Sequence, residues 1–123
     1  MNAPVPVPTV DVHEAATRLD GSPGEPLLVD VRELPEFVAV RAPGAVFLPL
    51  TSFGIRYAEL PRDRPLLLIC AAGGRSATAT AYLLQNGFAD VTNVAGGMTA
   101  WQRAGYAVTS GPIQPGEGDL PRD

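Results

Sequence analysis

The chain of 123 residues contains no lysine and only one cysteine and one histidine. Without lysine, Schiff-base chemistry and a phosphate-binding P-loop are excluded. One cysteine cannot form a disulfide within the chain. One cysteine and one histidine are too few ligands for a Cys/His zinc site, so we expect neither a metal nor another cofactor. A lone thiol stays available for chemistry in a reducing compartment, and we therefore expect the protein in the cytoplasm.

Long apolar runs and basic clusters are also missing. The longest apolar run, residues 66–72, is far too short to span a bilayer, and the beginning of the chain lacks the basic region and apolar core of a secretory signal. The net charge is −4 and the pI is about 4.8, which argues against a nucleic-acid-binding face. We expect no membrane and no nucleic acid among the partners.

Length and composition fit one globular domain between two Pro-rich ends. A hydrophobic fraction of 46% over 123 residues allows one domain with a real core. Residues 1–8 alternate with proline and predict an extended, poorly ordered arm. The domain is predicted over residues 9–108. From residue 109 the composition shifts to Ser, Gly, Pro, Gln, Glu and Asp, which predicts a flexible tail over 109–123, disordered or draped over the surface.

Strand-like and helix-like patterns alternate through the domain. Apolar runs predict strands at 9–10, 27–31, 46–48, 66–70 and 91–94. Helical spacing and end signals predict helices at 12–19, 34–40, 51–60 with an interruption at Gly54, 77–85 and 98–104. The alternation predicts an α/β fold with a central parallel five-stranded sheet and helices on both faces. Ligands of such sheets bind outside the carboxyl ends of the strands.

The only cysteine lies at the end of one of these strands, in the stretch Cys70-Ala71-Ala72-Gly73-Gly74-Arg75-Ser76. A thiolate there faces the amides of a Gly-rich turn, the positive end of a helix dipole and the Arg75 guanidinium. These groups favour the charged form, so we predict a lowered pKa and a nucleophilic Cys70. The alternative is an inert buried thiol, the commonest state of a lone cysteine.

The pattern C-x-x-G-x-R-S after an apolar strand resembles the active-site loop of the rhodanese-like sulfurtransferase family. Three further segments resemble that family in the expected order. They are Val29-Asp30-Val31-Arg32 followed by Glu36-Phe37, then Pro43-Gly44-Ala45, and Gly96-Gly97-Met98 followed by Trp101 and Gly105. The resemblance extends over residues 9–108 and implies a single rhodanese-like domain.

The resemblance implies a thiosulfate sulfurtransferase of the rhodanese type with Cys70 as its catalytic residue. Cys70 would take sulfur from a small anionic donor such as thiosulfate, hold it as a persulfide and pass it to cyanide, a thiol or a protein acceptor. The expected substrate-binding residues are Ala71, Ala72, Gly73, Gly74, Arg75 and Ser76, whose amides would cradle the anion. Arg75 either adds charge or braces the loop, and Ser76 either bonds the thiolate or caps the helix.

Three charged residues are candidates for the pocket rim: Asp30, Arg32 and Arg41. By resemblance, Asp30 holds adjacent loop backbone and Arg32 pairs with Glu36, so neither is expected to be catalytic. Arg41 stands where the family commonly has histidine. It either faces the pocket, where it would strengthen anion binding, or is a solvated surface charge. We expect Trp101 in the core and His13 facing solvent.

Three other functions are compatible with this loop. Cysteine-dependent phosphatases of related fold usually have five residues between cysteine and arginine, whereas only four separate Cys70 from Arg75 here. A non-catalytic rhodanese-like protein-binding module would not require a loop fit for a thiolate. A redox sensor with one cysteine could resolve its oxidised form only through another molecule.

Overall fold

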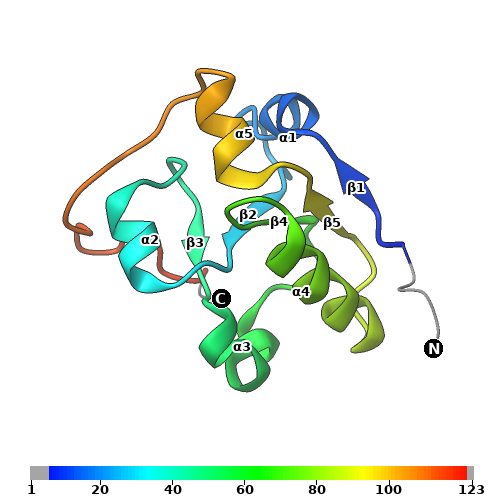
Figure 1. The fold of residues 1–123 in the computed structure, drawn as a ribbon. Coiled ribbons are helices and arrows are strands. Elements are labelled where there is room, and N and C mark those ends of the chain that lie inside the picture. The colour runs from blue at the N-terminus through cyan, green and yellow to red at the C-terminus, as the bar shows by residue number, and fades with distance from the viewer. Residues whose placement is uncertain (1–5, 122–123) are drawn as a thin grey trace.

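The centre of the molecule is a sheet of five short strands, seen in a computed structural model that describes residues 6–121 (Figure 1). The strands are β1 (Thr9–Val10), β2 (Leu27–Asp30), β3 (Val46–Phe47), β4 (Leu66–Ile69) and β5 (Val91–Val94). All pair in parallel, in the order β1-β5-β4-β2-β3. The predicted parallel five-stranded sheet is confirmed. The central strands β2 and β4 are buried at every position because both their faces are covered.

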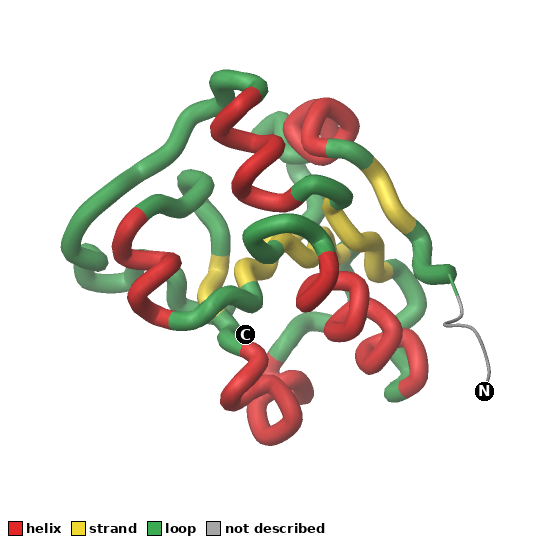
Figure 2. The backbone as a smooth tube through the Cα atoms, in the orientation of Figure 1, coloured by secondary structure: helices red, strands yellow, loops and turns green. Residues whose placement is uncertain are grey.

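Helices cover the two faces of the sheet (Figure 1, Figure 2). They are α1 (Val12–Arg18), α2 (Leu34–Ala39), α3 (Leu50–Arg56), the 3-10 turn η1 (Tyr57–Glu59), α4 (Gly74–Gln85) and α5 (Gly97–Arg103). Side chains alternate between faces along each strand, so Leu68 meets α3 and α4 while Leu67 meets the core under α1, α2 and α5. Trp101 is buried in this second core, as predicted.

Two helices, α3 and α4, differ from their predicted bounds by more than one residue at an end. Helix α4 begins at Gly74, three residues before the predicted start, because Gly73 takes a φ of +109° as its N-cap. The loop residues Arg75 and Ser76 therefore belong to the first turn of α4. Gly54 does not interrupt α3, which continues into η1. Neither difference moves Cys70 from the carboxyl end of β4.

Both ends of the described chain lie against the domain. Residues 1–5 of the predicted arm fall outside the described residues, and the Pro8 carbonyl accepts a hydrogen bond from the Asn93 amide. Residues 109–121 run past α2 to β3 (Figure 1), where the Gly118 carbonyl accepts from the Phe47 amide at 2.7 Å and Leu120 packs on the core. Within residues 6–121, no helix is long and apolar enough to cross a membrane.

Candidate active site

Cys70 follows β4 directly and lies at the carboxyl edge of the sheet. Its side chain points to the same face as Leu68, toward α4, and the residue is 1% exposed. The connection above it is open to solvent, with Ala72 and Gly74 exposed and Ala71 half-buried. The thiol is therefore buried beneath an exposed loop at the edge of the sheet where parallel α/β proteins bind ligands.

Hydrogen-bond donors surround the sulfur of Cys70. The Gly73 amide lies 3.0 Å from Sγ and the Ser76 hydroxyl 3.2 Å from it. The 12-residue helix α4 also begins here, with its positive end toward the sulfur. Burial alone would raise the pKa of Cys70, but hydrogen bonds from Ser76, Gly73 and Ala72 outweigh it and hold the pKa below its ordinary value. This direction agrees with the one expected from the sequence.

The first turn of α5 holds the backbone of the Cys70 loop through two hydrogen bonds. The Met98 amide donates to the Cys70 carbonyl at 2.8 Å, and the Thr99 amide donates to the Ala71 carbonyl at 3.0 Å. This close approach requires glycine at position 97, where φ is +54° and a Cβ would lie 2.7 Å from the Ala71 carbonyl carbon. The Gly96-Gly97-Met98 segment thus holds the backbone that carries Cys70.

Ser76 contacts the sulfur rather than capping the helix, since Gly73 is the N-cap residue of α4. Its hydroxyl also lies 2.6 Å from Oδ1 of Asn93, on β5. Both residues are buried, Ser76 at 0% and Asn93 at 5% exposure. Sequence reasoning missed Asn93, although a polar residue between Val91 and Val94 in a buried strand was a usable signal.

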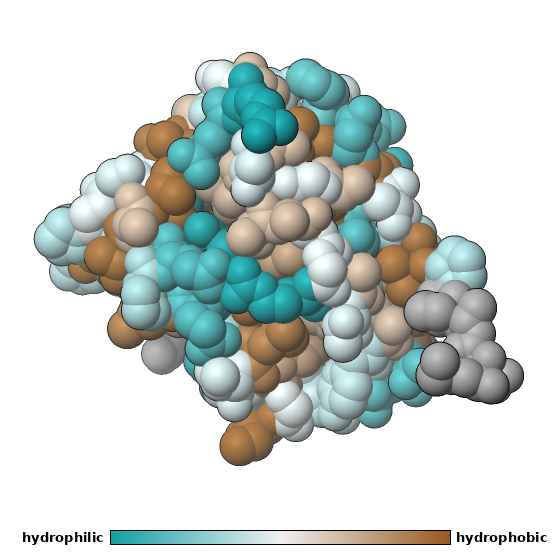
Figure 3. All heavy atoms as spheres, viewed as in Figure 1, coloured by the Kyte–Doolittle hydropathy of each residue, from teal (hydrophilic) through white to brown (hydrophobic). Residues whose placement is uncertain are grey.

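Arg75 braces the loop by pairing with α2. Its two terminal nitrogens bond the two carboxylate oxygens of Glu36 at 2.7 and 2.8 Å. Figure 3 shows hydrophilic atoms gathered between α2 and α4, where this pair joins the two helices. The hydrogen bond from Arg75 lowers the pKa of Glu36 to about 2. The same contact raises the pKa of Arg75 above its ordinary value.

Arg32 does not pair with Glu36, so that prediction is wrong. Its guanidinium turns back to Asp30, with Nη2 2.8 Å from Oδ2, and donates to the Val40 carbonyl at 2.6 Å. Asp30 also accepts from the Arg32 backbone amide at 3.0 Å, as a residue that holds loop backbone does. Asp30 and Arg32 are 0% and 3% exposed, so they support the end of β2 from within rather than lining an open rim.

Arg41 neither faces the pocket nor lies in solvent, and both alternatives offered for it are wrong. It is 1% exposed. Its guanidinium donates to the Gly111 carbonyl at 2.8 Å, the Phe37 carbonyl at 3.1 Å and the Glu117 carboxylate at 2.9 Å. These partners lie on α2 and in the C-terminal segment, which packs against α2. The sequence alone did not predict this contact.

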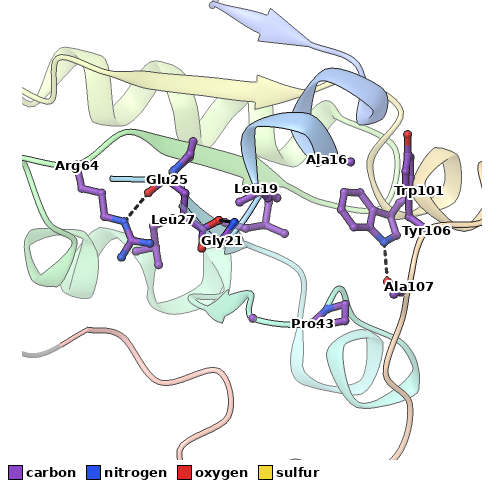
Figure 4. Close-up of a pocket in the computed structure, with 13 residues that line it drawn as sticks. Ala16, Leu19, Gly21, Glu25, Leu27, Pro43, Arg64, Trp101, Tyr106 and Ala107 are labelled. Carbon is purple, nitrogen blue, oxygen red and sulfur yellow. Dashed lines mark hydrogen bonds between the residues drawn. The ribbon is translucent and has the colours of Figure 1, made fainter. Parts of the chain in front are cut away.

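A separate hollow lies near the amino ends of the strands, on the opposite side of the sheet from the carboxyl ends where Cys70 lies (Figure 4). It has a volume of about 480 Å³, and its lining includes Leu19, Pro43 and Trp101. The Trp101 ring nitrogen donates to the Ala107 carbonyl at 2.9 Å beside it. This hollow is distinct from the Cys70 site. His13 is exposed, as predicted. Its Nδ1 lies 2.7 Å from the Tyr106 hydroxyl, so its side chain contacts Tyr106 and not the Cys70 loop.

Comparisons with known proteins agree with this geometry. A family model described as rhodanese-like domain matches residues 11–104. A sulfurtransferase from Allochromatium vinosum is 40% identical over 84 residues, which are 68% of this chain and 78% of that protein.

Solved structures of similar fold include a rhodanese-like domain protein from Staphylococcus aureus, with a TM-score of 0.73 and 30% identity over 84% of this chain and 99% of that one. A thiosulfate sulfurtransferase from Pseudomonas aeruginosa has a TM-score of 0.76 and 27% identity over 86% of this chain but only 21% of its own. The family match spans most of the sequence and includes the Cys70 loop with the segments that hold it, so this chain belongs to the rhodanese-like domain family.

Proposed function

We propose that this protein is a sulfurtransferase that carries sulfane sulfur as a persulfide on Cys70. The observation that carries the proposal is the surroundings of Sγ, which has the Gly73 amide at 3.0 Å and the Ser76 hydroxyl at 3.2 Å beneath an exposed loop. Such donors stabilise a thiolate near neutral pH without a general base. An ionised thiol is the nucleophile that sulfur transfer needs.

In the first half-reaction, the Cys70 thiolate attacks the outer sulfur of a small anionic donor such as thiosulfate. A bond forms between Sγ and that sulfur while the donor's own S–S bond breaks, and sulfite leaves with the bonding electron pair. The amides from Ala71 to Ser76 and the positive end of α4 stabilise the negative outer sulfur of the persulfide. Likeness to the Pseudomonas aeruginosa thiosulfate sulfurtransferase makes thiosulfate the donor to test first.

In the second half-reaction, a nucleophilic acceptor removes the outer sulfur. Cyanide becomes thiocyanate and a thiolate becomes a persulfide, while the electron pair of the broken S–S bond returns to Sγ. A thiol on a small molecule and a thiol on a protein both suit this step. Neither half-reaction uses a metal or an organic cofactor. A reducing compartment such as the cytoplasm would keep Cys70 free between turnovers.

The contacts of Arg75 favour sulfur transfer over phosphoester hydrolysis. A cysteine-dependent phosphatase needs its loop arginine to bind the phosphoryl group. Here both terminal nitrogens of Arg75 bond Glu36, at 2.7 and 2.8 Å, which commits the side chain to α2. The loop of four residues between Cys70 and Arg75 also offers fewer amides than a phosphatase loop.

The experiment is an intact-mass measurement of the protein after incubation with thiosulfate, run beside Cys70→Ser. We expect the wild type to gain one sulfur atom, to lose it on addition of cyanide with release of thiocyanate, and the variant to gain none. A wild type that takes no sulfur from thiosulfate or from an organic persulfide would overturn the proposal and favour the non-catalytic binding module. Hydrolysis of an aryl phosphate that depends on Cys70 would favour the phosphatase.

A further inference from the structure

The Ser76 hydroxyl lies between two acceptors that compete for its single proton. Sγ of Cys70 is 3.2 Å from Oγ on one side, and Oδ1 of Asn93 is 2.6 Å from it on the other. A serine hydroxyl donates one hydrogen bond and accepts others. While Ser76 donates to Asn93, it can therefore offer the sulfur only a lone pair.

The strand register explains why Asn93 reaches this position. Asn93 on β5 pairs with Leu68 on β4, and Cys70 follows Leu68 by two residues on the same face. Ser76, in the first turn of α4, lies over both strands and meets the two side chains. All three polar groups are at least nine-tenths buried, so solvent does not readily replace a missing partner.

We propose that Asn93 is a positioning residue that sets the direction of the Ser76 proton during the sulfur-transfer cycle. This inference rests on the proposed function for the cycle itself. In the structure Oδ1 of Asn93 faces Ser76 within reach of its hydroxyl, and Sγ is also within reach. When the proton goes to Oδ1, the lone pair of Ser76 faces the sulfur. That arrangement suits the Cys70 thiol, which donates S–H to Oγ. The persulfide does not need the Ser76 proton at Sγ, because its charge lies on the outer sulfur.

The opposite orientation suits the free thiolate. A half-turn of the Asn93 amide places Nδ2 toward Ser76, so that Asn93 donates to Oγ and Ser76 donates to the charged Sγ. The terminal torsion of asparagine has broad, roughly two-fold preferences, which permits this change. Asparagine thus keeps a buried hydroxyl bonded whether or not Sγ carries charge, which an acceptor-only or apolar side chain cannot do.

Two substitutions at position 93 should move the ionisation of Cys70 in opposite directions. In Asn93→Leu the thiol form leaves the Ser76 proton without an acceptor, whereas the thiolate still receives it, so the pH midpoint of Cys70 alkylation should fall. In Asn93→Asp the carboxylate takes the proton and adds negative charge, so the midpoint should rise. Each shift should be about one pH unit, the scale of one hydrogen bond to a charged group.

The test measures alkylation of Cys70 by iodoacetamide against pH in the wild type, both variants and Thr92→Val. Thr92, buried on the opposite face of β5, is the matched control and should leave the midpoint unchanged. In a Ser76→Ala background, Asn93→Leu should have no effect, because Asn93 acts through Ser76. If Asn93→Asp does not fold, the leucine variant alone decides the question.

Midpoints that move in the same direction in both variants, or a leucine effect that persists in Ser76→Ala, would overturn the role assigned to Asn93. The sulfurtransferase proposal is judged separately by the sulfur gained from thiosulfate in the same wild-type preparation. A wild type that gains no sulfur would defeat that proposal, whereas a leucine shift abolished by Ser76→Ala would still establish the link from Asn93 through Ser76 to Cys70.

Discussion

The Arg75 guanidinium and the Glu36 carboxylate meet through two parallel hydrogen bonds of 2.7 and 2.8 Å. The contact ties the first turn of α4, which carries the end of the Cys70 loop, to the first turn of α2. Glu36 also accepts from the Glu33 backbone amide, so one carboxylate caps α2 and holds the loop. The position of the Cys70 loop therefore depends on α2, a helix distant from it in sequence.

Replacing Glu36 by glutamine should reduce stability in a pH-dependent way. The folded-state pKa of Glu36 is about 2, below its ordinary 4.5, because of the hydrogen bond from Arg75. The contribution of the pair is therefore complete above pH 4.5 and is lost as the pH falls toward 2. The expected loss at pH 7 is about 1 kcal/mol or less, because the two side chains are 37% and 36% exposed.

Urea unfolding of the wild type and Glu36→Gln from pH 7 to pH 2 tests this prediction. The two stabilities should converge in acid. The control is Glu14→Gln, which removes an exposed partner of Arg18 at 3.7 Å and should change little at any pH. A gap between wild type and Glu36→Gln that stays constant down to pH 2 would contradict the assignment.

Arg41→Met should destabilise the protein far more than Arg56→Met. Arg41 is 1% exposed and donates to carbonyls of α2 and the C-terminal segment, all of which lose their donor in the variant. We expect a loss of roughly 3 kcal/mol, because buried or half-buried carbonyls are left without a hydrogen-bond donor. Arg56 pairs with Glu59 at the surface, where the two side chains are 39% and 53% exposed. Arg56→Met should therefore lower the free energy of unfolding by about 1 kcal/mol or less.

Limited proteolysis gives a second readout of the same contact. If Arg41 holds the C-terminal segment in place, Arg41→Met should expose residues 109–121 to cleavage before the rest of the domain unfolds. Equal urea midpoints for the two variants, with unchanged cleavage, would show that Arg41 does not anchor the segment.

Local patterns made the fold and the place of Cys70 at the end of β4 predictable. The run Leu66 to Ile69 identifies a buried strand, and the glycines after Cys70 identify a tight turn into a helix, so both could be inferred from neighbours in sequence. The resemblance implied the Arg32 to Glu36 pair, but Arg32 precedes the N-cap of α2 and does not share a helix face with Glu36. Its closest carboxylate is the one two residues earlier, on Asp30.

Contacts between distant segments could not be predicted in this way. Arg41 takes partners from residues 111–117, and no periodicity connects that segment to α2. Asn93 reaches Ser76 only because β5 lies beside β4, a strand order that alternation alone does not specify. Long-range contacts of this kind decide which polar side chains are buried, and the prediction for Arg41 failed because the sequence did not reveal them.

Gly97→Ala should abolish or strongly slow the gain of sulfur by Cys70. A methyl group at position 97 would press on the Ala71 carbonyl, which the Thr99 amide holds at 3.0 Å, and would displace the loop. Gly105→Ala is the matched control, because φ there is +82° and no atom of residues 6–121 comes within 4 Å of the added carbon. The control bears the backbone strain of a positive φ, about 1 kcal/mol, without moving the loop. If Gly97→Ala and Gly105→Ala gained sulfur equally, the close contact at Gly97 would not be needed for sulfur uptake by Cys70.

Alkylation of Cys70 should have a pH midpoint below that of free cysteine, about 8.5, because the hydrogen bonds from Ser76, Gly73 and Ala72 outweigh burial. Ser76→Ala removes the donor at 3.2 Å and should raise the midpoint. Thr78→Val, on the exposed side of the same helix, should not. Iodoacetamide is neutral, so its rate reports the thiolate fraction rather than attraction to the loop. A wild-type midpoint at or above 8.5 would mean that burial dominates at Sγ, and the thiolate on which sulfur transfer depends would then be scarce at neutral pH.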